Sequence, residues 1–114
     1  MPWLLRDGEV LASLEVADAP GTRTRGLLGR DGIEGALLLR PAAAVHTLGM
    51  RFPIDVAYCD ADLRVLDTVT MPRWRLGRPR RAARAVVEAE AGAFERWRLA
   101  PGDELEVADG PSWP

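Results

Sequence analysis

The hydrophobic and polar positions near the start of the chain alternate in a way that predicts a β-hairpin. Residues 9–16 place Leu14 and Val16 on one side of an extended strand, whereas Glu15 points to the other. Asp7-Gly8 separates this segment from the apolar residues 3–6, and Asp-Gly between two apolar segments is a strong signal for a hairpin turn. The chain is therefore expected to begin with two antiparallel strands.

Further apolar segments predict several short strands. Residues 36–39 and 54–59 are almost continuously apolar and are interpreted as buried strands, and 63–71 alternates with a period of two, apart from Asp67 on its apolar face. Residues 44–50 form a weaker strand candidate. The secondary structure of residues 83–90 cannot be assigned from the pattern, because Ala and Glu favour a helix while Val86-Val87 favours a strand. A last strand is expected at residues 105–107.

Two short helices complete the expected elements. The first runs from Thr22, as a capping residue, to about residue 28, and the second lies within 91–99. Many short strands with few helices favour a mainly β fold, a compact β-barrel or sandwich. With 114 residues, 47% of them hydrophobic, the chain is expected to form one β-rich domain over residues 1–110, followed by a short C-terminal tail at 111–114.

Charge and cysteine content narrow the functional classes. The formal net charge is −2, which does not suggest a polyanion-binding protein, although six of the arginines are concentrated between residues 73 and 84. The single cysteine, Cys59, excludes an intrachain disulfide, and neither a signal peptide nor a membrane-spanning segment is evident. We therefore expect a cytoplasmic protein without a cofactor or membrane partner, either a monomer or a weak homodimer.

Four short motifs follow one another along the chain: Arg25-Gly26-Leu27-Leu28-Gly29-Arg30, His46-Thr47-Leu48-Gly49-Met50-Arg51-Phe52-Pro53-Ile54-Asp55, Val86-Val87-Glu88-Ala89-Glu90-Ala91-Gly92 and Pro101-Gly102-Asp103. In order and spacing they resemble the motifs of the domain of unknown function 192 family. The family pattern carries Met where this chain has Leu28, a volume-conserving difference. His46–Met50 occupies the place of a Trp-Met-x-Asn-Thr segment found in many members and is similar to a His-Thr-x-Gly-Met variant. The resemblance covers residues 9–107 and implies a mainly β fold without an established activity.

Polar residues within these motifs define a candidate binding site. Asp55 interrupts an apolar strand, so a buried carboxylate there requires a partner, for which Arg25 or Arg30 is expected. Arginine suits an anionic ligand, and His46 is the only histidine. The leading hypothesis is a small binding or accessory domain with a shallow polar site for a small anionic ligand, formed by Arg25, Arg30, His46 and Asp55. The partner is an unidentified small molecule or protein.

Alternative readings of the same residues remain open. A small enzyme would use His46 as general base and Asp55 to orient it. The arginine-rich segment 73–84, with Trp74 among its charges, suits weak contact with a protein or, less readily, nucleic acid. A Cys59–His46 nucleophile pair has little support, and a closed zinc site would need four ligands where one cysteine and one histidine are available, so no metal site is expected. Structural roles for Asp55 and His46 are the simpler alternatives.

Overall fold

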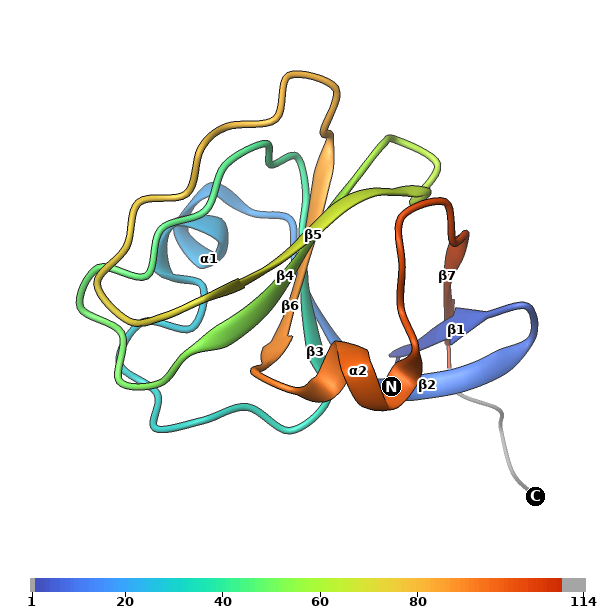
Figure 1. Ribbon diagram of the computed structural model, residues 1–114, viewed down its shortest axis with the longest axis horizontal. Coiled ribbons are helices and arrows are strands. Elements are labelled where there is room, and N and C mark those ends of the chain that lie inside the picture. Colours follow the sequence, from blue (N-terminus) through green and yellow to red (C-terminus); the bar gives the residue numbers. More distant parts are fainter. Residues whose placement is uncertain (1, 110–114) are drawn as a thin grey trace.

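The computed structural model describes residues 2–109 and has a mainly β fold, as the sequence predicted (Figure 1). The C-terminal tail predicted at 111–114 lies outside these residues. Two short helices, α1 (Pro20–Arg25) and α2 (Ala93–Trp97), accompany the strands. The strands are β1 (Pro2–Arg6), β2 (Glu9–Ala17), β3 (Ala36–Leu39), β4 (Ile54–Cys59), β5 (Val65–Met71), β6 (Ala85–Glu90) and β7 (Leu105–Asp109).

All seven strands belong to one sheet in the order β5-β4-β6-β3-β2-β1-β7. Only β2 and β3 are parallel, and every other neighbouring pair is antiparallel. The two edge strands, β5 and β7, approach each other at one point. There the amide of Val65, the first residue of β5, donates to the carbonyl of Asp103, just before β7, at 2.8 Å. The strands themselves do not pair along their length, so the sheet is not closed into a barrel.

The central strands β3, β4 and β6 are buried on both faces, which explains their nearly continuous apolar sequences. One face contributes to a core that includes side chains from all seven strands and from α2. The opposite face is covered by residues around α1 and by the 45–50 segment, which form a second core with Leu37, Val56 and Val86. Successive residues of one strand therefore enter different cores.

Several sequence-based expectations are confirmed, and others are wrong for identifiable reasons. The hairpin is confirmed, and 85–90 is a strand rather than a helix because it pairs with both β3 and β4. The expected strand at 44–50 is absent apart from an isolated bridge between His46 and Leu76. There the Thr47 hydroxyl donates to the Pro72 carbonyl at 2.6 Å and accepts from the Arg75 amide at 2.9 Å, which holds the segment against a turn.

Helix α1 begins earlier than predicted, because Pro20 occupies its first turn, where a missing amide hydrogen does no harm. Thr22 is not the capping residue; its hydroxyl donates to the carbonyl of Ala19. The helix ends at Gly26, whose φ of 49° and ψ of −125° suit glycine alone. Leu27 then enters the second core at 2% exposure, which anchors the short helix to the sheet.

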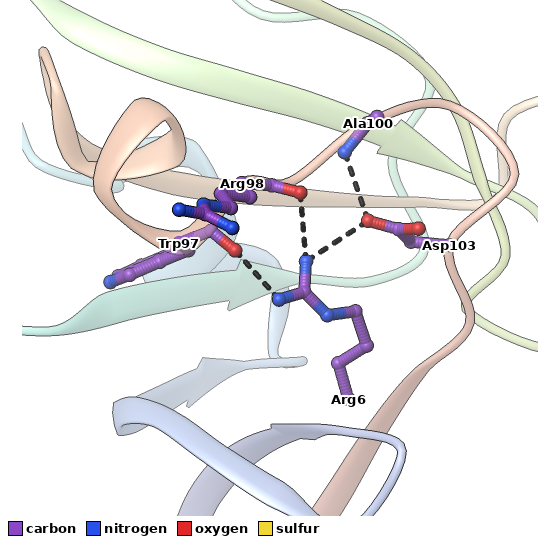
Figure 2. A network of polar contacts seen from close by, with 5 residues as sticks. All are labelled: Arg6, Trp97, Arg98, Ala100 and Asp103. Carbon is purple, nitrogen blue, oxygen red and sulfur yellow. Dashed lines mark hydrogen bonds and ion pairs between the residues drawn. The ribbon is translucent and has the colours of Figure 1, made fainter.

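Arg6 joins the N-terminal hairpin to the end of α2 (Figure 2). Its guanidinium donates to the carbonyl oxygens of Trp97 and Arg98 at 2.7 and 2.9 Å and to the Asp103 carboxylate at 3.1 Å. The same carboxylate accepts from the amide of Ala100 at 2.9 Å. One arginine thus satisfies carbonyl groups at a helix C-terminus that would otherwise lack partners. Within residues 2–109, no helix is long and apolar enough to cross a membrane.

Candidate functional site

A pocket of about 420 Å³, including its open mouth, lies over the second core, where α1 and the segment after β3 approach the sheet. Main-chain and side-chain atoms from three parts of the chain form it. The lining combines apolar side chains with a carboxylate, a histidine and two arginines. The lining residues are Arg23, Thr24, Arg25, Gly26, Leu27, Leu28, Leu39, Ala44, Val45, His46, Met50 and Glu88.

Glu88 is the most unusual group in this pocket. Alternation along β6 directs it to the same face as Val86, and its cross-strand neighbours are Leu37 on β3 and Val56 on β4. Its exposure is 4%, and its carboxylate takes part in none of the side-chain hydrogen bonds or ion pairs found among residues 2–109. Burial raises the pKa of Glu88 to about 7, because an ionised carboxylate loses hydration there.

Gly26 closes the pocket above this carboxylate. A Cβ atom added at Gly26 would lie 3.8 Å from Oε1 of Glu88 and 3.9 Å from a methyl group of Leu39. Those distances leave room for an ordinary contact, so the glycine is required for its backbone conformation rather than for space. The turn at the end of α1 therefore brings the main chain over Glu88.

Two arginines from α1 line the pocket. Nη1 of Arg23 donates to the carbonyl of Pro41 at 3.0 Å, but its Nε is buried without a hydrogen-bond partner. Arg25 is exposed, and none of the ion pairs between described residues involves it. The pocket therefore offers guanidinium groups at its mouth and a buried carboxylate at its floor.

His46 also lines the pocket and is exposed. Its Nδ1 accepts a hydrogen bond from the amide of Leu48 at 3.2 Å. This assigns the proton of the neutral ring to Nε2, which is then a hydrogen-bond donor. The structure thus brings together two of the sequence-predicted site residues, Arg25 and His46.

Arg30 lies outside the pocket lining. Its guanidinium forms a two-pronged interaction with the carboxylate of Glu15 on β2, at 2.7 and 3.1 Å. The hydrogen bond from Arg30 lowers the pKa of Glu15 and raises that of Arg30, in spite of partial burial that acts in the opposite direction. Both side chains are substantially exposed, so this ion pair contributes little to stability.

Asp55 also lies outside the pocket lining, on the opposite face of the sheet from Glu88, and the expectation of an arginine partner for it is wrong. Its Oδ2 accepts from the amides of Gly92 and Phe94 at 2.9 and 3.1 Å, and its Oδ1 accepts from the Thr70 hydroxyl at 2.6 Å. Neutral donors from the start of α2 therefore satisfy the buried carboxylate. The bonds join β4, β5 and α2, and neither of its oxygens bonds to His46.

Cys59 is fully buried in the first core, as expected for a small apolar cysteine. Burial raises the pKa of its thiol to about 12, so the reactive thiolate is scarce near neutral pH. Among residues 2–109, no group of three or more histidine, cysteine or carboxylate side chains is arranged to hold a metal ion.

Sequence reasoning missed Glu88, although the signal was present. Glu88 interrupts the apolar residues 85–89, just as Asp55 interrupts 54–59. A charged residue in an apolar strand requires a partner or a pocket. Asp55 has its partners in the protein, whereas Glu88 faces a pocket, and this difference depends on the packing of α1 over the sheet.

The protein is thus a small, mainly β domain with a pocket on one face of its open sheet, and polar side chains surround the mouth of this pocket. The chain belongs to the DUF192 family, described as Uncharacterized ACR, whose family model matches residues 4–107. Curated relatives of similar sequence are called UPF0127 proteins, a name that states no activity. One from Thermococcus kodakarensis is 31% identical over 79% of this chain and 61% of its own length. One from Thermococcus gammatolerans is 33% identical over 79% of this chain and 63% of its own.

The matched region thus spans less than two thirds of these two relatives. Solved structures show the same fold. A protein of unknown function from Novosphingobium aromaticivorans superposes with a TM-score of 0.77 at 21% identity, covering 92% of this chain and 82% of the other. A Sinorhizobium meliloti protein, described provisionally as a transcription regulator, also gives 0.77, at 20% identity and with 93% and 91% coverage.

Proposed function

We propose that this protein is a small binding or accessory domain whose pocket takes a compact anionic ligand that also carries a hydrogen-bond donor. A hydroxy acid or an amino acid has this combination. The acidic group would pair with Arg25 at the mouth, and the donor would reach Glu88 at the floor. The ligand is thus anionic, as the sequence suggested. Arg25, His46 and Glu88 would recognise it, whereas Arg30 and Asp55 would not contact it.

The observation that carries the proposal is the buried carboxylate of Glu88, which has no hydrogen-bond partner among the described residues. Such a group costs folding free energy, because burial removes much of its hydration and no protein donor replaces it. A ligand that donates a hydrogen bond to the ionised carboxylate restores the lost interaction in a poorly hydrated site, where a charge-assisted bond is strong.

The mouth supports the anionic part of the ligand. Arg25 is exposed there, Arg23 presents a buried Nε without a partner, and His46 offers an Nε2 donor. Guanidinium groups bind carboxylate and phosphate through paired hydrogen bonds. Part of the 420 Å³ volume is the open mouth, so the enclosed space suits a ligand of few heavy atoms better than a nucleotide or cofactor.

The test is a calorimetric titration of glycolate, lactate, glycine, malate and glycerol 3-phosphate into the wild-type protein and the variants Glu88→Gln and Arg25→Ser. We expect at least one of these acids to bind, and each variant to weaken that binding by about tenfold or more, the loss of a charge-assisted hydrogen bond. Wild-type affinity should increase from pH 6 to pH 8, as Glu88 ionises. Glu88→Gln should abolish that increase.

Two variants serve as matched controls. Glu90→Gln removes an exposed carboxylate from the same strand, and Arg30→Ser removes an arginine that is engaged with Glu15. Both should bind the acid as the wild type does. Equal losses in the control and pocket variants, or no binding of any of the five acids, would contradict the proposal.

The cytoplasmic location expected from the sequence is part of the same proposal. It is supported by the state of the single cysteine, which is free and buried. A domain of this kind does not depend on an oxidising compartment. Fractionation of cells expressing the full chain, with detection in the soluble or the exported fraction, tests this location directly.

A further inference from the structure

Four of the five large hydrophobic side chains that the described residues expose lie on three adjoining segments. Trp74 and Leu76 are the most exposed, at 62% and 76%, and Leu28 and Leu48 are exposed at 40% and 38%. We call these four residues the apolar rim. Val10, the fifth, lies on the N-terminal hairpin. Isolated exposed apolar residues are ordinary, but a group at one place marks an interaction surface.

Contacts between the three segments bring the rim together. His46 and Leu76 form a β-bridge, and the amide of Trp74 donates to the carbonyl of Thr47 at 2.9 Å. A Cβ atom added at Gly49, next to Leu48, would lie 3.1 Å from a methyl group of Leu28. The 72–84 loop, the 45–50 segment and the turn after α1 therefore share one end of the molecule (Figure 1).

The exposure of Trp74 is not explained by folding. Its φ of 61° lies in the left-handed region, which is unfavourable for a bulky side chain, and its ring is not among the buried or partly buried groups of either core. Strained backbone conformations cluster at binding sites, which supports a contact made by this exposed ring.

The charge around the rim is strongly cationic. No aspartate or glutamate occurs between residues 68 and 87, whereas six arginines do. Arg80 is paired with Asp67 at 2.8 Å, but Arg73, Arg75 and Arg78 are exposed and have no carboxylate within ion-pair distance in the described chain. Around these three, the local positive charge opposes the overall net charge of −2.

We propose that the apolar rim and the arginines beside it form a peripheral contact with an anionic lipid bilayer. Aliphatic side chains and tryptophan partition into the headgroup region, while neighbouring arginines pair with lipid phosphates. The composition favours lipid over single-stranded nucleic acid, because three of the four rim residues are leucines, which do not stack on bases. This contact needs no spanning helix, and it adjoins the Glu88 pocket, because Leu28 belongs both to the rim and to the pocket lining.

The experiment is co-sedimentation of the full chain with vesicles of phosphatidylcholine plus phosphatidylglycerol, and with phosphatidylcholine vesicles alone. We expect binding to the mixed vesicles only, weakening as salt increases. Trp74→Ser/Leu76→Ser should abolish it. Arg73→Ser/Arg78→Ser should weaken it by about 30-fold, since each basic residue near an anionic surface contributes a factor of about 5.

Matched changes elsewhere provide controls. Val10→Ser removes an exposed apolar side chain outside the rim, and Arg64→Ser/Arg98→Ser removes two exposed charges from other segments. These proteins should sediment with the mixed vesicles as the wild type does. The proposal is overturned by absence of vesicle binding, by equal binding to neutral vesicles, by equal losses in the control variants, or by tight oligonucleotide binding without vesicle binding.

Discussion

Replacing Glu88 with glutamine should change the pH dependence of stability in a direction that the structure fixes. Burial raises the pKa of Glu88 from 4.5 to about 7 in the folded protein. Below pH 4.5 both the folded and the unfolded chain hold the proton, so ionisation costs nothing. Between pH 4.5 and 7 the unfolded chain releases the proton while the folded chain retains it, and the free energy of unfolding of the wild type therefore falls as the pH rises.

The size of the effect follows from the same difference. A pKa raised from 4.5 to about 7 corresponds to a loss of about 3 kcal/mol of folding free energy once the pH exceeds 7. Glu88→Gln keeps the shape of the side chain and removes the ionisation. As the pH rises from 4 to 8, the free energy of unfolding of the variant should increase by about 3 kcal/mol relative to that of the wild type. This corresponds to a difference on the order of 10 °C in Tm.

Urea unfolding followed by circular dichroism at pH 4, 6 and 8 gives the free energies directly. Glu90→Gln, an exposed change on the same strand, should keep a nearly constant difference from the wild type across this range. If the difference between Glu88→Gln and the wild type is also constant, Glu88 is not desolvated in the folded protein and is not a buried carboxylate at the pocket floor.

Three further predictions concern groups outside the pocket. Asp55→Ala leaves two backbone amides and a hydroxyl without their acceptor, so it should lower the free energy of unfolding by roughly 3 kcal/mol in urea titrations; a loss under about 0.5 kcal/mol would refute this role. Arg6→Ala should cost about 2 kcal/mol in the same assay, since the carbonyls of Trp97 and Arg98 lose their donor; unchanged stability would contradict it. Cys59 should react with a thiol reagent at pH 8 only after unfolding, and rapid labelling of the native protein would be inconsistent with its burial and its pKa of about 12.

The strands could be predicted where the hydrophobic pattern of the sequence agrees with the burial of the strand in the folded protein. The continuous apolar segments 36–39 and 54–59 are strands buried on both faces, and Asp7-Gly8 forms the expected hairpin turn. Residues 85–90 were undecidable locally, because their strand conformation depends on pairing with β3 and β4. The sequence pattern of the 44–50 segment is typical of a strand, but hydrogen bonds of Thr47 hold it against the 72–75 turn instead of a neighbouring strand.

The candidate site was predictable in part. Arg25 and His46 line the pocket because α1 and the 45–50 segment meet over the sheet. The partners of Arg30 and Asp55 could not be inferred, since they come from β2, β5 and α2 through tertiary packing. Glu88 and Asp55 give the same sequence signal, a carboxylate in an apolar strand. They differ in the face of the sheet to which each points, because Glu88 faces the pocket and Asp55 faces its hydrogen-bond donors.

Amide chemical-shift mapping shows directly whether a small acid binds in the pocket at Glu88 or elsewhere on the protein. Spectra of the ¹⁵N-labelled protein would be recorded with and without the acid that binds most tightly in calorimetry. We expect the largest shifts on the amides of Gly26, Val45, His46 and Glu88. Shifts concentrated around Asp55 or near the N-terminal hairpin, with these four amides unchanged, would contradict binding in the pocket.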